Sequence, residues 1–184
     1  MTMLDYPKDY FLPALISQEQ LKKKIHELGQ QITRDYQDKE ILCIGVLNGA
    51  VQFLVHLIEE IKLPLNIDFI SVSSYGDSTE SSGKLSWRLN LLQDISNKHV
   101  IIVEDIIDTG ITLHEVKKEF LKQNPKSLKI ASLFSKPSRR EIDVDIDYLG
   151  FEIENHYVVG FGFDYQGYYR NLPHVAILPE DRYK

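Results

Sequence analysis

The sequence is poor in cysteine and contains no long apolar segment. Cys43 is the only cysteine among the 184 residues, so an internal disulfide cannot form, and a reducing compartment is expected. No run approaches the ~18 consecutive apolar residues that a membrane-spanning helix needs, and no basic segment followed by an apolar one opens the chain as in a secretory signal. We therefore predict a cytoplasmic protein with no membrane partner.

Positive charge is also scarce. The 21 Lys and Arg residues are outnumbered by 27 Asp and Glu residues, which gives a net charge of −6 at pH 7. Affinity for nucleic acid depends largely on clustered Lys and Arg, so a nucleic-acid partner is not expected, whereas a small anionic ligand remains compatible with local groups. With 43% hydrophobic and 26% charged residues, the composition is that of a folded protein, and we predict a single domain over residues 1–184.

Two common phosphate-binding motifs are missing as well. The sequence has neither G-x-G-x-x-G after a strand nor G-x-x-x-x-G-K-[ST]. A dinucleotide-binding fold and a P-loop nucleotide hydrolase are therefore not supported. The six histidines show no metal-ligand spacing, and we expect all of them to be structural.

The pattern of apolar residues predicts an α/β fold with a parallel sheet. Short continuous apolar runs alternate with segments of helical period, which is typical of strands covered on both faces. Ser17 followed by Gln20 resembles a capping box, so the first helix is expected to begin there. The predicted helices span residues 17–36, 50–60 and 113–123, and the predicted strands span residues 41–47, 69–73, 100–103 and 129–134.

The last third of the sequence changes character. Three strand-like segments, at residues 148–153, 157–163 and 175–178, carry no helix signal between them. We predict a small β-rich hood, built from about residues 141–184 with N-terminal residues, beside a core of about residues 38–140. Residues 73–83 are rich in Ser and Gly and predict a mobile loop, a kind of segment that is often functional in compact domains.

The most informative segment spans residues 99–113. A buried strand leads into the adjacent carboxylates Glu104 and Asp105, then into a turn with Asp108, and a helix opens at the Thr-Gly-Ile-Thr of residues 109–112. Ligands of open α/β sheets bind at the carboxyl ends of the strands, and the free N–H groups of a first helical turn bind anions. The segment therefore predicts a phosphate site with acids beside it. The alternative, in which Asp108 and the threonines only cap the helix, leaves the two acids at the strand end unexplained.

Residues 103–113 resemble the phosphoribosyl pyrophosphate signature of type I phosphoribosyltransferases, and in detail that of the hypoxanthine-guanine branch. The similarity covers nearly the whole chain, because four more motifs follow the family order at residues 46–50, 73–76, 135–137 and 157–165. It implies the type I phosphoribosyltransferase fold, a twisted, mainly parallel sheet flanked by helices with a small hood. It also implies a purine-salvage enzyme that converts hypoxanthine or guanine and phosphoribosyl pyrophosphate to IMP or GMP and pyrophosphate.

The resemblance assigns roles on the sugar-phosphate side of the site. Asp108 would be the general base or acid at purine N7. Glu104 and Asp105 would bind one Mg²⁺, directly or through water, and Asp164 would bind a second Mg²⁺. The phosphoribosyl group would contact Glu104, Asp105, Asp108, Thr109, Gly110, Ile111 and Thr112. Pyrophosphate would contact Leu47, Asn48, Gly49 and Arg170, with a cis peptide between Leu47 and Asn48, and Asn48 stands where several relatives carry Lys or Arg.

The resemblance also assigns the base side. Lys136 would donate to the purine O6, which an amino group at that position, as in adenine, could not accept. Tyr157 would stack on the purine, and the backbone of Val158 and Asp164 would contact the ring edge. Ser74 and Tyr75 would belong to a flexible loop that closes over the site.

Two other functions remain open at this stage. One is a regulator that keeps the fold and binds nucleotide or RNA with little catalysis, although a basic face is not evident. The other is an enzyme that prefers xanthine or is confined to hypoxanthine. The family also implies a homodimer or homotetramer.

Overall fold

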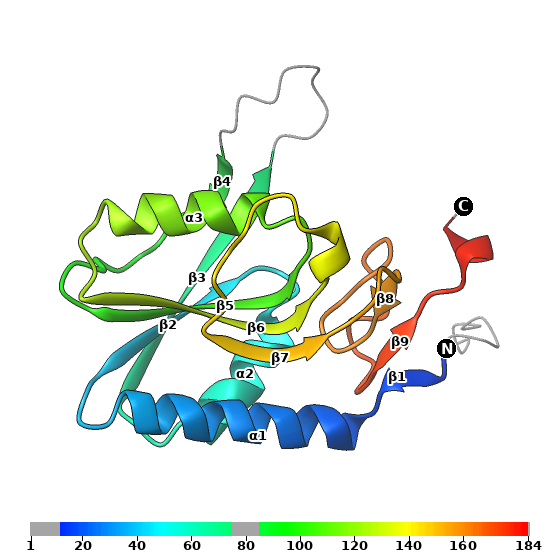
Figure 1. Cartoon of the computed structure of the whole chain (residues 1–184), viewed down its shortest axis with the longest axis horizontal. Coiled ribbons are helices and arrows are strands. Elements are labelled where there is room, and N and C mark those ends of the chain that lie inside the picture. Colours follow the sequence, from blue (N-terminus) through cyan, green and yellow to red (C-terminus); the bar gives the residue numbers. More distant parts are fainter. Residues whose placement is uncertain (1–11, 75–84, 184) are drawn as a thin grey trace, which may run out of the picture.

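A computed structural model describes residues 12–74 and 85–183 (Figure 1). A sheet of six strands lies between helices, and a second sheet of three strands lies beside it. The predicted α/β fold, a mainly parallel sheet with flanking helices and a small β-rich hood, is confirmed. In spatial order the large sheet contains β4 (Leu85–Leu89), β3 (Leu65–Ser74), β2 (Ile41–Val46), β5 (His99–Ile107), β6 (Ser127–Ser135) and β7 (Tyr148–Glu152).

The strands from β3 to β7 in this order run parallel to one another, and only β4 is antiparallel to its neighbour β3. The carboxyl ends of five strands therefore meet at one edge of the large sheet. The turns that follow these strands carry the side chains discussed below, in keeping with the general position of ligand sites in open α/β sheets.

Helices cover both faces of the large sheet. In Figure 1, α1 (Gln18–Asp35) and α2 (Val51–Glu60) lie on one face and α3 (Ile111–Leu121) lies on the other. Alternate residues of β2 face opposite sides of the sheet: Ile41 and Cys43 pack in the core beneath α1 and α2, whereas Leu42 and Ile44 pack in the core beneath α3. This double burial explains why β2 is apolar throughout. None of the helices in the described part of the chain is long and apolar enough to cross a membrane.

The predicted capping box at the start of α1 is confirmed. The backbone N–H of Gln20 donates to Ser17 Oγ at 3.2 Å, and the backbone N–H of Ser17 donates to Gln20 Oε1 at 2.8 Å. Two N–H groups that the helix itself cannot satisfy are thereby paired, which stabilises this helix end by about 1 kcal/mol.

The small sheet is antiparallel, with β9 (Val175–Ile177) between β1 (Ala14–Ile16) and β8 (Val158–Val159). It has an apolar core of its own, and N-terminal residues contribute to it through β1, a strand that was not predicted. Two short 3₁₀ helices, η1 (Pro137–Arg139) and η2 (Glu180–Arg182), follow β6 and β9.

Two predictions about the hood are wrong in detail. The segment at residues 148–153 was assigned to the hood, but β7 pairs in parallel with β6 and forms the edge of the large sheet. An apolar run indicates a strand without naming its partner, so the sequence could not place it. In the segment at residues 157–163 only Val158 and Val159 form a strand, because residues 160–163 turn back on themselves through the pair Gly160 and Phe163.

Three strand boundaries also differ from the predictions. Strand β4 was not predicted, since its five residues gain their place only by pairing with β3. Strand β5 continues past Glu104 and Asp105 to Ile107, so these two acids lie within the C-terminal part of the strand and not after its end. Strand β3 reaches Ser74, and the remainder of the predicted loop, from residue 75 to residue 83, lies outside the described residues.

Candidate active site

Two adjoining cavities open at the carboxyl edge of the large sheet. One, of about 270 Å³, is lined by the turn after β5 and the loop after β2. The other, of about 650 Å³, lies between this edge and the small sheet. Gly49, Asp105, Ile106 and Asp108 line both, so the two cavities meet at the end of β5.

Most of the predicted site residues gather around these cavities. The smaller one is lined by Leu47, Gly49, Glu104, Asp105, Asp108, Thr109, Gly110 and Thr112. The larger one is lined by Gly49, Asp105, Asp108, Lys136, Tyr157, Val158, Asp164 and Arg170. Asn48 and Ile111 are near these residues in the sequence but line neither cavity.

Glu104 and Asp105 form an unusual pair of adjacent, partly buried carboxylates. Burial raises the pKa of Glu104 well above its ordinary value, and the negative charge of Asp105 raises it further. Burial raises the pKa of Asp105 too, against the N–H of Ile106 at 2.8 Å and the charge of Arg170, which both lower it. A site that raises the pKa of two neighbouring acids is one in which a bound cation would be stabilised.

Gly49 is required where the loop after β2 passes Asp105. A Cβ atom at position 49 would lie 1.6 Å from Asp105 Oδ2, so any side chain there would collide with the carboxylate. The peptide between Leu47 and Asn48 in the same loop is cis, as expected. Gly162 of the hood approaches the loop from the other side, since a Cβ atom on it would lie 2.2 Å from the carbonyl oxygen of Gly49.

The turn after β5 ends in a left-handed residue. Gly110 has φ = 86° and occupies the N-cap position of α3, where no side chain caps the helix. The alternative of helix capping holds in part, because Thr109 Oγ1 accepts a long hydrogen bond from the backbone N–H of Ile111 at 3.4 Å, whereas the Asp108 carboxylate binds Arg139. The first turn of α3 lies at the smaller cavity, which Gly110, Thr112 and Leu113 line, and the N–H groups of a first helical turn suit an anion.

The segment after η1 holds this turn in place. Arg140 Nη1 donates to the carbonyl oxygen of Asp108 at 3.0 Å, and the N–H groups of Glu141 and Ile142 donate to the carbonyl oxygen of Thr109 at 2.9 and 3.1 Å. We call residues 139–142 the strap. Through Arg140, Glu141 and Ile142 it holds the backbone of the turn by carbonyl oxygens alone.

Asp108 itself is held at one oxygen. Arg139 Nε donates to Asp108 Oδ1 at 3.2 Å, and both side chains are half-exposed. Among the described residues no donor contacts Oδ2. One carboxylate oxygen of Asp108 is thus available to a ligand in either cavity.

The groups expected to bind the base lie in the larger cavity. Lys136, whose side chain is 8% exposed, has its pKa lowered by burial, although the charge of Asp108 opposes the shift. Tyr157 is 39% exposed and its hydroxyl donates to the carbonyl oxygen of Asp164 at 3.3 Å. Val158 is buried in β8 beside it.

Asp164 and Arg170 are bound to one another. Arg170 Nη2 lies 2.5 Å from Asp164 Oδ1, and the N–H of Gly167 donates to Asp164 Oδ2 at 2.7 Å. Asp164 was expected to bind Mg²⁺ and Arg170 to bind pyrophosphate. Each ligand would therefore contact a residue that already takes part in an ion pair. Of the two loop residues, Ser74 ends β3 and Tyr75 lies outside the described residues.

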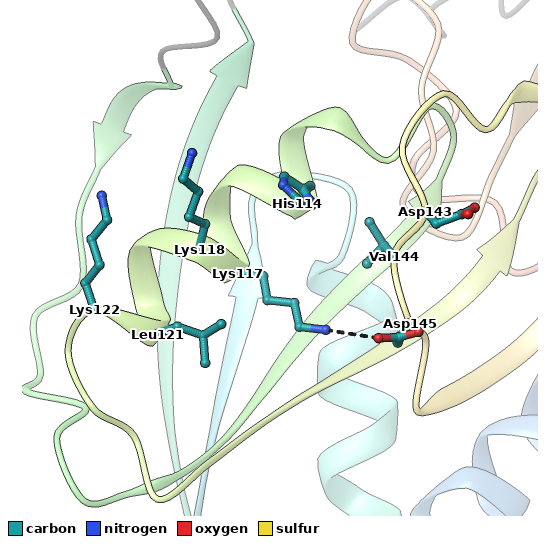
Figure 2. Close-up of a pocket in the computed structure, with 8 residues that line it drawn as sticks. All are labelled: His114, Lys117, Lys118, Leu121, Lys122, Asp143, Val144 and Asp145. Carbon is teal, nitrogen blue, oxygen red and sulfur yellow. Dashed lines mark ion pairs between the residues drawn. The ribbon is translucent and has the colours of Figure 1, made fainter.

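Another cavity, of about 600 Å³, lies apart from these groups between α3 and residues 143–145. Figure 2 shows Lys117 reaching across it toward Asp145, at 3.7 Å, while Lys118 and Lys122 point away from Asp143 and Asp145. Both of those lysines pair with glutamates of their own helix. Each of the three lysines therefore lies within 4 Å of a carboxylate, and none of the predicted site residues lines this cavity.

Similarity to known proteins extends over most of the chain. Residues 14–166 match the phosphoribosyl transferase domain family. The chain is 45% identical over 165 residues to the hypoxanthine-guanine phosphoribosyltransferase of Bacillus subtilis, covering 90% of this chain and 92% of that protein. It is 44% identical over 170 residues to the protein of the same name from Streptococcus mutans, covering 92% and 94%. The chain belongs to the hypoxanthine-guanine phosphoribosyltransferase family.

Solved structures of the family have the same fold as this phosphoribosyltransferase. A hypoxanthine phosphoribosyltransferase of Staphylococcus aureus, 38% identical, superimposes with a TM-score of 0.92 over 99% of this chain and 100% of that one. A hypoxanthine-guanine phosphoribosyltransferase of Bacillus anthracis, 46% identical, gives a TM-score of 0.87 over 91% and 98%, and it holds a HEPES molecule in its active site. The resemblance found in the sequence is thereby confirmed.

Sequence reasoning missed several residues that line the larger cavity of this phosphoribosyltransferase. His156 was expected to be structural, yet it lines the cavity, and its Nε2 lies 3.2 Å from Glu154. Ile106 and Phe163 lie inside recognised motifs, whereas no sequence signal marked the others. The missed residues are Ile106, Arg139, Asn155, His156, Phe163, Glu180 and Tyr183.

Proposed function

We propose that this chain transfers the phosphoribosyl group of phosphoribosyl pyrophosphate to N9 of hypoxanthine or guanine. The observation that carries the proposal is the position of Asp108, which lines both the cavity around the turn after β5 and the cavity that contains Lys136 and Tyr157. A sugar phosphate in the first and a base in the second would meet at this carboxylate. N9 attacks C1 of the ribose as the bond from C1 to the pyrophosphate oxygen breaks, which gives IMP or GMP.

On the donor side, the turn at residues 108–112 binds the 5-phosphate. The N–H groups at the start of α3 have no helical partner, and the hydroxyls of Thr109 and Thr112 add donors to the same cavity. Because the strap fixes the backbone beforehand, little conformational entropy is lost when the phosphate binds. Glu104 and Asp105 accept hydrogen bonds from the ribose hydroxyls.

Mg²⁺ belongs to the same proposal. Glu104 and Asp105 of β5 would hold one ion and Asp164 of the hood a second, and their chemistry fits, because Mg²⁺ prefers oxygen ligands and the pKa values of Glu104 and Asp105 are raised without metal. No group of three His, Cys, Asp or Glu side chains within the described ranges could hold a metal ion by itself. This agrees with an ion that takes its remaining oxygens from substrate and water. When bound, Mg²⁺ offsets the charge that develops on the leaving pyrophosphate.

On the base side, selectivity comes from a buried donor. Lys136, which is 8% exposed, donates to the O6 of a 6-oxopurine, and adenine would leave this buried donor unpaired. Tyr157 stacks on the purine, and the backbone of Val158 and Asp164 contacts the ring edge. Oδ2 of Asp108, which no described donor contacts, exchanges the proton at N7 while Arg139 holds Oδ1.

Pyrophosphate leaves along the loop after β2. The backbone N–H groups of Leu47, Asn48 and Gly49 are the donors proposed for it, and Arg170 supplies a positive charge from the hood. Asn48 is exposed and lines neither cavity, so we expect only its backbone to take part. A cytoplasmic location and assembly as a homodimer or homotetramer complete the proposal, and light scattering coupled to size-exclusion chromatography measures the assembly.

A product assay tests the function directly. The purified chain is incubated with phosphoribosyl pyrophosphate, Mg²⁺ and one of adenine, hypoxanthine, guanine or xanthine, and both pyrophosphate and nucleotide are measured. We expect nucleotide with hypoxanthine and guanine and none with adenine. The same amount of pyrophosphate without any nucleotide would mean hydrolysis of the donor. No product together with a salt-dependent affinity for RNA would instead identify a regulator.

A further inference from the structure

The C-terminal segment reaches the cavity in which the base is proposed to bind. After β9 the chain stays beside β8, since the N–H of Leu178 donates to the carbonyl oxygen of Tyr157 at 2.8 Å. The 3₁₀ helix η2 then carries Glu180 and Tyr183 to the lining of the cavity. None of the motifs that indicated the family includes this segment.

Tyr183 packs directly on Tyr157. The ring centroids are 5.0 Å apart and the ring planes are inclined by 30°, an arrangement close to stacking. Tyr165 contacts the same ring at right angles, with centroids 5.7 Å apart. The hydroxyl of Tyr157 donates to the carbonyl oxygen of Asp164, so the ring is held at its hydroxyl and by two neighbouring tyrosine rings.

A flat ring has two faces, and Tyr183 takes one of those of Tyr157. A purine that stacks on Tyr157 therefore takes the other, and Tyr157 becomes the middle layer of three. Tyr183 is itself held in position, because its N–H donates to the carbonyl oxygen of Glu180 at 3.2 Å and its side chain packs against the core of the small sheet. The neighbouring Arg182 Nη1 donates to the hydroxyl of Tyr169 at 3.3 Å, which ties η2 to the hood.

We propose that Tyr183 is a positioning residue for the purine base: it backs the Tyr157 ring and holds that ring in the orientation that accepts the base. The inference rests on the proposed function, because it assumes that a purine stacks on Tyr157. Without Tyr183 the Tyr157 ring gains freedom that each binding event must remove, which weakens base binding and leaves the donor site unchanged. Loss of one aromatic contact of this kind is expected to weaken the affinity for the base by about 2- to 10-fold.

The test compares Tyr183→Ala with Tyr183→Phe and with Tyr168→Ala. Phenylalanine keeps the ring at position 183, and Tyr168 is a matched hood tyrosine that is 67% exposed and lines neither cavity. Steady-state rates give kcat and the KM of hypoxanthine at saturating donor, and the KM of the donor at saturating hypoxanthine. Circular dichroism and melting curves establish that each variant is folded.

We expect Tyr183→Ala to raise the hypoxanthine KM by about 2- to 10-fold, with kcat and the donor KM within twofold of wild type. Tyr183→Phe and Tyr168→Ala should match the wild type. An unchanged hypoxanthine KM in Tyr183→Ala, a lower one, or an equal rise in both KM values would overturn the inference. A wild-type chain that makes no nucleotide would overturn the proposed function and this inference with it, whereas an active wild type with indistinguishable variants would overturn the inference alone.

Discussion

Replacing Gly110 by Ala should lower both the free energy of unfolding of the chain and its affinity for the phosphoribosyl donor. Gly110 has φ = 86°, and an L-residue in this left-handed region costs roughly 1–2 kcal/mol. A Cβ atom there would also lie 2.3 Å from the carbonyl oxygen of Ile142, which is backbone of the strap and cannot rotate away. Overpacking of this kind costs about 1–3 kcal/mol, so we expect the variant to lose about 2–5 kcal/mol of stability.

Gly167 offers a matched control. It also has φ = 86°, but a Cβ atom at this position would meet nothing within 4 Å. Gly167→Ala should therefore lose only the conformational part, about 1–2 kcal/mol. In a protein of this size 1 kcal/mol shifts the melting temperature by about 2–4 °C, so Gly110→Ala should melt roughly 2–12 °C below the control.

The two variants should also differ in donor binding. A shift of the strap at Ile142 loosens the hydrogen bonds that hold the carbonyl oxygen of Thr109, and with them the turn that is proposed to bind the 5-phosphate. Loss of one charge-assisted hydrogen bond to the phosphate would raise the donor KM about 10-fold or more in Gly110→Ala. Melting curves and steady-state kinetics measure both effects. If the two variants melt together and share the donor KM of the wild type, the role given to the strap is wrong.

Four further predictions concern single side chains. Asp108→Asn should lower kcat by ~10²-fold with little change in the donor KM, and unchanged turnover would remove the proton-transfer role. Lys136→Met keeps the side-chain length without the donor, so the hypoxanthine KM should rise about 10-fold or more while the KM of the donor stays constant; equal rises would contradict a role in base selection. Cys43 is fully buried, which raises its pKa to about 12, so an aromatic disulfide reagent should modify it only in unfolded chain. Burial and nearby lysines lower the pKa of His99, so its contribution to the free energy of unfolding should be fully present above the ordinary histidine pKa of about 6.5 and should be lost as the pH drops below it. The denaturant midpoint of His99→Gln should therefore fall less than that of the wild type over this range.

Local signals in the sequence were sufficient for the elements whose residues determine their own structure. The capping box at Ser17 and the apolar run of β2 each predicted an element with nearly the observed bounds, because a helix end and a doubly buried strand are encoded by neighbouring residues. The acids and threonines after β5 likewise fall on one continuous segment. Their gathering around two cavities follows from the parallel arrangement of the strands.

Features that depend on contacts between distant residues were not predictable in this way. The β7 segment reads as a strand in either sheet, and only its pairing with β6 places it at the edge of the large one. Arg139 reads as an ordinary surface charge until it is found 3.2 Å from Asp108, 31 residues away in the chain. Tyr183 lies 26 positions after Tyr157 and carries no motif, so its place in the cavity is a property of the hood as a whole.

Because different parts of the proposed site lie on the two sheets, the base specificity of such a protein can change in evolution separately from its sugar-phosphate site. The acids, the turn at residues 108–112 and the strap belong to the large sheet, whereas Tyr157, Val158 and Asp164 belong to residues that fold around the small one. On the proposed function, exchanging Lys136 and the hood residues around Tyr157, with Asp164 and Arg170 kept, would alter which heterocycle is accepted while the residues that bind the activated sugar are inherited unchanged. Descendants of one ancestral chain could thus acquire new acceptors by changes confined to the last thirty or so residues and a single lysine.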